Sequence, residues 1–156
     1  YKIVGIFFLV YLFLALGEII GFPTFSQWKM MVENSGSVFS PKLELSFFSH
    51  LKDRSNFLNI IFFLPVGLFL PILWTRFKKF LPTVFYGFFF SLFIECSQLF
   101  TLYRVSDVND LVMNTLGTIG GWVIWKIIFS HFFKQTAENN QDFIIFPFII
   151  AFICFI

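Results

Sequence analysis

The sequence predicts an all-α protein, a polytopic transmembrane helix bundle with four to five spanning helices and an interfacial loop between the first and the second. Of its 156 residues, 58% are hydrophobic and 23% aromatic, whereas only 13% are charged. Soluble globular domains carry about 25% charged residues. Several apolar runs also approach the ~20 residues that a helix needs to cross a hydrocarbon core of about 30 Å. These observations indicate an integral membrane protein.

Composition also excludes some partners and sites. The net charge of +2 is not clustered into a basic run interleaved with aromatic residues, so nucleic acid is excluded as a partner. Cys96 and Cys154 are isolated in apolar segments and predict neither a disulfide framework nor a CxxC site. We find no internal repeat and expect residues 1–156 to form a single domain. Because the chain begins at Tyr1 and stops inside an apolar run, we expect further residues at one or both ends.

The first predicted span covers Ile3 to Phe22, with Glu18 near its far end. The run is longer than the apolar core of a signal peptide and lacks a small-residue cleavage pattern, so we expect a retained helix. Thr24 to Asn56 is the long polar segment, and it mixes charges with aromatic residues throughout. That mixture is typical of a loop at the membrane interface.

The second predicted span covers Asn56 to Trp74 and contains Pro65 and Pro71, which predict a kink or a break. The connector that follows, Thr75 to Leu81, has the densest positive charge of the chain, supplied by Arg76, Lys78 and Lys79. Short basic loops tend to stay in the cytoplasm, so we expect this connector there.

The third span covers Pro82 to Phe100, and the fourth covers Leu111 to about Phe133. Between them lies the polar turn Thr101 to Asp110. A last apolar run, Phe143 to Ile156, has fourteen residues. At 1.5 Å per residue it is about 21 Å long, so it is incomplete, tilted or interfacial.

Polar residues gather at one end of these spans. Because successive spans alternate in direction, the end of the first and third and the start of the second and fourth fall at one membrane level. Ionisable groups at membrane depth cost roughly 2.5 to 3.5 kcal/mol each on insertion scales and usually mark function. If the basic connector is cytoplasmic, the cavity that they form opens on the external side. The candidate site residues are Glu18, Asn59, Glu95, Gln98, Arg104, Asp107, Asp110 and Asn114.

Two stripes of polar and small residues predict how the last two spans pack. At 100° per residue, one stripe falls within roughly 80° on the fourth span. A matching stripe follows the third span. Small residues let helices approach closely in lipid, so we expect the two stripes to face each other. Their members are Asp107, Asp110, Asn114, Gly117 and Gly121, and Gly87, Ser91, Glu95 and Gln98.

Three motifs in this order resemble the VanZ family of bacterial membrane proteins: NIIFFLPVG at Asn59 to Gly67, ECSQ at Glu95 to Gln98, and RVSDVNDLVMNTLG at Arg104 to Gly117. The resemblance covers residues 56–121. Its signature positions are Asn59, Pro65, Gly67, Glu95, Gln98, Arg104, Asp107, Asp110, Asn114 and Gly117. One departure is in the upstream loop, where Glu44 to Phe48 lacks the asparagine and proline of an Asn-x-x-Pro-Phe pattern.

The resemblance implies a multi-pass protein of the bacterial cell membrane that lowers sensitivity to teicoplanin and related lipoglycopeptides. It implies no biochemical mechanism. Membrane lipids, a lipid-linked cell-wall precursor or a lipoglycopeptide are the expected partners.

Three hypotheses for the polar cluster stay open. In the first, the cavity binds a headgroup or a lipid-linked envelope component, with Arg104 on a phosphate or carboxylate. In the second, a membrane enzyme uses Glu95 as general base while Asp107 and Asp110 hold a divalent cation, a candidate cofactor since hard cations prefer such oxygen ligands. In the third, the cluster only joins helix ends, with Asp107 or Asp110 capping the fourth helix.

Overall fold

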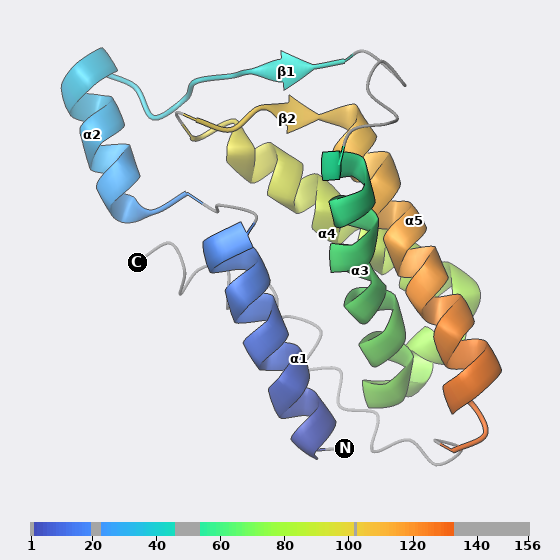
Figure 1. The fold of residues 1–156 in the computed structure, drawn as a ribbon. Coiled ribbons are helices and arrows are strands. Elements are labelled where there is room, and N and C mark those ends of the chain that lie inside the picture. Colours follow the sequence, from blue (N-terminus) through green and yellow to red (C-terminus); the bar gives the residue numbers. More distant parts are fainter. Residues whose placement is uncertain (1, 20–22, 46–53, 102, 133–156) are drawn as a thin grey trace.

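The computed structural model describes residues 2–19, 23–45, 54–101 and 103–132, and these are mostly helical (Figure 1). The helices are α1 (Lys2–Leu14), α2 (Phe25–Ser35), α3 (Arg54–Leu73), α4 (Phe80–Gln98) and α5 (Val108–Ile124). Short turns of other helix types follow α1, α3 and α5, namely η1 (Ala15–Ile19), η2 (Thr75–Lys78) and η3 (Trp125–Phe129). The described part of the chain also contains two strands of two residues each, β1 (Leu43–Glu44) and β2 (Ser106–Asp107).

Within the described residues, three helices are long and apolar enough to cross a membrane: Arg54–Leu73, Phe80–Gln98 and Val108–Phe129. They correspond to the predicted second, third and fourth spans, which are thereby confirmed as helices of spanning length. The predicted first span contains a shorter apolar helix, Ile3–Gly17. The last apolar run, residues 143–156, lies outside the described residues.

Helices α3 and α5 form the closest helix pair, and glycine makes their approach possible. A Cβ atom on Gly67 would overlap the carbonyl oxygen of Thr118, and one on Gly121 would overlap that of Leu64. In lipid, no hydrophobic driving force brings two helices together. Small residues stabilise such contacts because they allow the two backbones to pack closely. The expectation that the glycines of α5 face α4 was therefore wrong, because they face α3.

The stripe on α5 is in fact divided between two neighbours. Toward α4, a Cβ on Gly87 would overlap the side chain of Thr118. One turn nearer the polar end, the Asn114 amide donates a hydrogen bond of 2.9 Å to the Ser91 hydroxyl. A stripe of roughly 80° is wide enough to touch two helices. Here Asn114 contacts α4, whereas Asp110 and the two glycines face α3.

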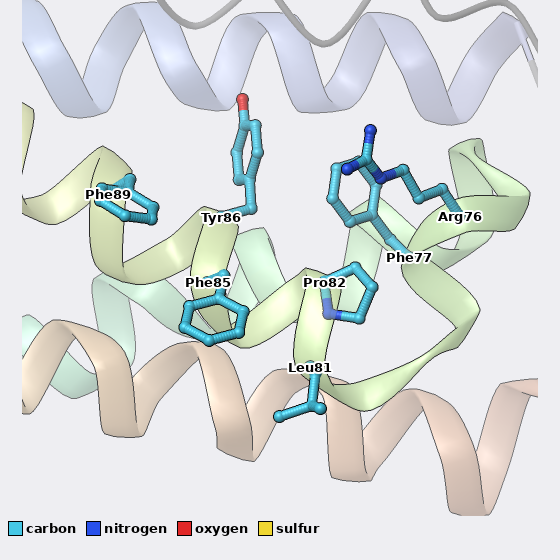
Figure 2. Close-up of a pocket in the computed structure, with 7 residues that line it drawn as sticks. All are labelled: Arg76, Phe77, Leu81, Pro82, Phe85, Tyr86 and Phe89. Atoms are coloured by element: carbon cyan, nitrogen blue, oxygen red, sulfur yellow. The ribbon is translucent and has the colours of Figure 1, made fainter.

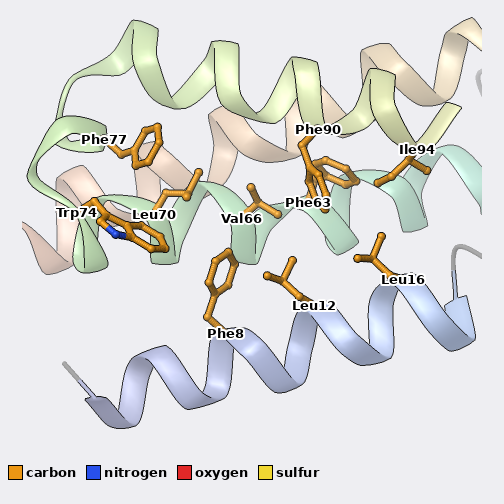
Figure 3. Packing of buried hydrophobic residues seen from close by; sticks show 10 residues of the cluster. All are labelled: Phe8, Leu12, Leu16, Phe63, Val66, Leu70, Trp74, Phe77, Phe90 and Ile94. Atoms are coloured by element: carbon orange, nitrogen blue, oxygen red, sulfur yellow. The ribbon is translucent and has the colours of Figure 1, made fainter. Parts of the chain in front are cut away.

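Helix α1 covers the outer face of α3 (Figures 1 and 3). Its residues Phe8, Leu12 and Leu16 recur at intervals of four and are buried against the core cluster. The ring of Phe8 packs edge-on against Trp74, with ring centroids 6.3 Å apart. Repeats of four residues place these side chains on one face of a helix, so α1 presents one apolar face to the bundle.

Pro65 and Pro71 both lie inside the continuous helix α3. Of the predicted kink or break, the break is therefore absent. One turn before Pro65, the hydroxyl of Tyr11 on α1 donates to the carbonyl of Phe62. The carbonyl that Pro65 leaves without a helical donor is that of Ile61, so this bond joins α1 to α3 beside the proline and does not replace the lost hydrogen bond.

The segment predicted as an interfacial loop contains structure of its own. Thr24 and Gln27 form a capping box at the start of α2. The indole of Trp28 donates to the Phe100 carbonyl over 3.0 Å, and Met31 is fully buried. Helix α2 thus docks beside the end of α4.

The same segment then pairs with the turn that follows α4. Strand β1 runs parallel to β2, with Leu43 opposite Ser106. The Ser106 amide donates to the Lys42 carbonyl over 2.9 Å, and the Ser40 amide donates to the Leu99 carbonyl over 3.0 Å. Both strands lie across the end of the bundle at which α4 ends and α5 begins (Figure 1). The polar end of the bundle is therefore held by main-chain hydrogen bonds from two loops.

Candidate functional site

A cavity of about 210 Å³ opens where the start of α3, the end of α4 and the start of α5 meet. One part of its wall is apolar and consists of Leu58, Phe62, Phe63 and Ile94. The rest is polar and consists of Ser55, Asn59, Glu95, Gln98, Arg104, Asp110 and Asn114.

Glu95 is the most deeply buried carboxylate among the described residues, with 4% of its surface exposed. It accepts a hydrogen bond of 2.9 Å from the main-chain amide of Asp107, and the Ser106 hydroxyl is a second donor to it. A buried carboxylate needs such donors because its desolvation is otherwise very costly. Strand β2, which β1 holds in place, therefore fixes the Glu95 side chain against the cavity.

The two aspartates at the start of α5 have different positions. Asp107 is the N-cap, and its Oδ1 accepts from the Asn109 amide over 2.8 Å. This confirms the capping expected of one of the two aspartates. Asp110 lies in the first turn of α5, is half-buried and lines the cavity. A negative charge there is also favoured by the positive end of the helix dipole.

Three amide side chains line the cavity, each with an atom that makes no hydrogen bond. These atoms are buried and are Asn59 Nδ2, Gln98 Oε1 and Asn114 Oδ1. The side chains of Gln98 and Asn114 are only 7% and 5% exposed. The Asn59 amide faces the Asp110 carboxylate without reaching hydrogen-bond geometry. Each unsatisfied buried polar group costs about 1–3 kcal/mol, so the cavity is lined by three atoms that can hydrogen-bond to a polar group inside it.

Charge in the cavity is unequally distributed. Two carboxylates, Glu95 and Asp110, line its wall, whereas the one cationic lining residue is Arg104. Arg104 is exposed at the mouth, and its charge interacts with Asp110. Within the described residues, no three His, Cys, Asp or Glu side chains converge as a metal site. The divalent cation at Asp107 and Asp110 stays a prediction.

Six of the eight candidate site residues line the same cavity: Asn59, Glu95, Gln98, Arg104, Asp110 and Asn114. Asp107 lies beside it and acts through its main-chain amide on Glu95. Glu18 belongs to η1, and its side chain lies outside the described part of the chain.

Sequence reasoning missed two serines. Ser55 lines the cavity one helical turn before Asn59, and this spacing of four residues was a signal that could have found it. Ser106, which contacts Glu95, had no such signal because its position depends on the pairing of β1 with β2.

A larger cavity, of about 720 Å³, lies at the opposite end of α4 (Figure 2). Its lining is aromatic and aliphatic apart from Arg76 and the hydroxyl of Tyr86, which points toward α1. It brings together no carboxylate or amide. Size therefore does not identify the functional site in this protein, and the smaller polar cavity is the better candidate.

The family model VanZ/LLP1 matches residues 8–130. The chain belongs to the VanZ/LLP1 family. The match extends from α1 to η3 and so contains every residue of the polar cavity. The comparisons with curated proteins and with solved structures gave no match. Membership of the VanZ/LLP1 family and several apolar helices together describe a multi-pass membrane protein.

Proposed function

We propose that this VanZ/LLP1 protein lowers the sensitivity of a bacterium to teicoplanin and related lipoglycopeptides by binding the polar headgroup of an envelope lipid or lipid-linked precursor. The observation that carries the proposal is the set of three buried amide atoms without hydrogen-bond partners around one cavity, at Asn59, Gln98 and Asn114. A ligand that completes these bonds stabilises the folded protein and is held with defined orientation.

The size of the cavity supports a headgroup over a whole antibiotic. Its volume is about 210 Å³, whereas pockets for drug-sized ligands span about 300–1,000 Å³. A volume of this size corresponds to about seven water molecules at roughly 30 Å³ each. A lipoglycopeptide is far larger, so it does not fit inside. The effect on the antibiotic is therefore indirect, through the envelope component that the protein binds.

The proposal is tested by expression in a teicoplanin-sensitive Gram-positive host. Cells with the wild-type protein should have a higher minimum inhibitory concentration of teicoplanin than cells with an empty vector. Arg104→Gln removes the cation at the mouth and should abolish the difference, whereas Cys96→Ala, on an exposed position of α4, should retain it. Equal susceptibility of wild type and empty vector, at comparable membrane expression, would show that this member does not act on teicoplanin.

An enzyme acting on a lipid-linked substrate is the second candidate, and the buried carboxylate of Glu95 on the cavity wall favours it. In this hypothesis Glu95 is the general base and takes a proton from the substrate. Glu95→Gln keeps the shape and removes the base. Envelope lipids and peptidoglycan are compared by mass spectrometry between wild type and variant. A product that appears only with the wild type supports an enzyme, whereas identical profiles with retained ligand binding support the binding protein.

A further inference from the structure

We propose that the polar cavity is specific for a lipid headgroup in which a primary ammonium group lies next to a phosphate, as in phosphatidylethanolamine. The inference rests on the headgroup-binding function proposed above and names the chemical class of the ligand.

The inner wall of the cavity is complementary to a hydrogen-bond donor with positive charge. Carboxylates of Glu95 and Asp110 line it, together with the unpartnered oxygens Gln98 Oε1 and Asn114 Oδ1. A primary ammonium group donates three hydrogen bonds and carries the charge that offsets buried carboxylates. A neutral hydroxyl would satisfy the amide oxygens but would leave the negative charge without compensation. The wall therefore favours an ammonium group over a sugar.

The mouth of the cavity carries the opposite charge. Arg104 is exposed there, and a guanidinium group binds phosphate through paired, charge-assisted hydrogen bonds. Its charge, which interacts with Asp110, also disfavours a bare divalent metal ion at that carboxylate. A zwitterion with its ammonium inside and its phosphate at the mouth satisfies both regions at once.

The apolar part of the wall indicates that the headgroup belongs to a lipid. Leu58 and Phe62 lie on the side of α3 that the cavity shares with its polar residues, and Leu58 is 46% exposed. Apolar side chains beside a polar pocket fit a glycerol backbone and the start of an acyl chain, since apolar surface gains about 25 cal/mol per Å² when it is covered. Free phosphoethanolamine would gain nothing from this contact.

The test compares three lipids with identical acyl chains in detergent solution by native mass spectrometry. They are phosphatidylethanolamine, phosphatidylcholine, whose trimethylated nitrogen has the same charge but no N–H donor, and phosphatidylglycerol, which has no ammonium group. Wild-type protein should retain phosphatidylethanolamine at least about ten-fold more strongly than either of the others. Equal retention of phosphatidylethanolamine and phosphatidylcholine would overturn the proposal.

Gln98→Met is the decisive variant. It removes an acceptor that has no hydrogen-bond partner within the protein, so folding should be unaffected or slightly improved while the preference for phosphatidylethanolamine falls about ten-fold. The matched control on α4 is Cys96→Ala, which lies at an exposed position outside the cavity. A Gln98→Met protein that melts at the wild-type temperature and keeps the full preference would refute the assignment.

Two further measurements test whether the free headgroup or a metal ion explains the retention of phosphatidylethanolamine. Free phosphoethanolamine should compete at least about ten-fold more weakly than a short-chain lipid with the same headgroup, and equal competition would overturn the lipid assignment. Retention of phosphatidylethanolamine that disappears on addition of EDTA would show that a metal ion, and not the protein carboxylates, holds the headgroup.

The inference and the proposed function fail in different experiments. Loss of lipid selectivity in a protein that still raises the teicoplanin inhibitory concentration removes the inference and leaves the function. Full selectivity in a protein that leaves susceptibility unchanged removes the role in resistance and leaves a site for a phosphoethanolamine lipid.

Discussion

At the scale of single residues, neighbouring polar groups of the candidate site have different roles. Asp107 uses its side chain to cap α5 and its main-chain amide to hold Glu95. Asp110, only one turn away, has no capping role and lines the cavity. Two aspartates of similar sequence context therefore have separable effects, one on stability and one on ligand binding.

Asp107→Ala should destabilise the protein by about 1 kcal/mol, because alanine cannot accept the Asn109 amide at the N-cap. Asp107→Asn should cost much less, since asparagine is an equally good cap. Both substitutions retain the main-chain amide that binds Glu95. Thermal unfolding in detergent measures the difference, and equal stability of the two variants would contradict the capping role.

Asp110→Asn should reduce binding of a cationic headgroup and abolish the effect on teicoplanin susceptibility. Its cost in stability should be small, about 0.3–1 kcal/mol for the lost charge at the helix start. If the cluster only joined helices, the phenotype would survive, because asparagine keeps the shape and the hydrogen-bonding capacity. Inhibitory concentration and melting temperature, measured on the same variant, separate these outcomes.

At the scale of helices, the position of the cavity depends on the glycine contact between α3 and α5. Close approach of these helices along Gly67, Gly117 and Gly121 brings the start of each to one end of the bundle. Asn59 on α3 then faces Asp110 on α5. The cavity is thus a consequence of how the apolar parts of the helices pack.

Gly121→Ala should destabilise the bundle by about 1–3 kcal/mol or more, because the added Cβ would overlap main-chain atoms of α3 that have no room to move. The adjacent Gly120→Ala is the matched control. There the nearest atom is the flexible end of Leu64, at 3.1 Å, and alanine gains about 1 kcal/mol in helix propensity. Thermal unfolding of the two variants checks the expectation, and a tolerated alanine at position 121 would contradict it.

The spans were predictable because length and hydropathy are local properties, and the convergence of Asn59, Glu95 and Asp110 followed from alternation of direction. The sequence could not predict which helix the stripe on α5 packs against. A stripe that includes Asn114 and Gly121 can contact either α3 or α4. The pairing of β1 with β2 was not predictable either. Two residues per strand carry no periodicity, and their pairing depends on tertiary position alone.

At the scale of the whole molecule, sidedness decides which compounds the cavity can meet. The basic connector at the far end of α4 predicts a cytoplasmic position for that end, so the polar cavity is expected to face outward. An outward cavity is accessible to lipids of the outer leaflet, where a glycopeptide and its target meet.

Membrane-impermeant thiol labelling tests this orientation. In a background without Cys96 and Cys154, Tyr103→Cys beside the cavity should react in intact cells, since residue 103 is 80% exposed. Lys79→Cys, in the exposed connector, should react only after permeabilisation. The reverse pattern would place the cavity in the cytoplasm and remove its access to the outer leaflet.

Main-chain hydrogen bonds join the loop before α3 to the turn before α5, and this has a consequence for mutational scanning. The bonds at Ser40 and Ser106 are donated by main-chain amides, and their acceptors are main-chain carbonyls. Alanine substitutions from residue 40 to residue 44 would leave those bonds in place and would suggest that the loop is dispensable. Proline at position 40 or 106 deletes a donor and would expose the dependence.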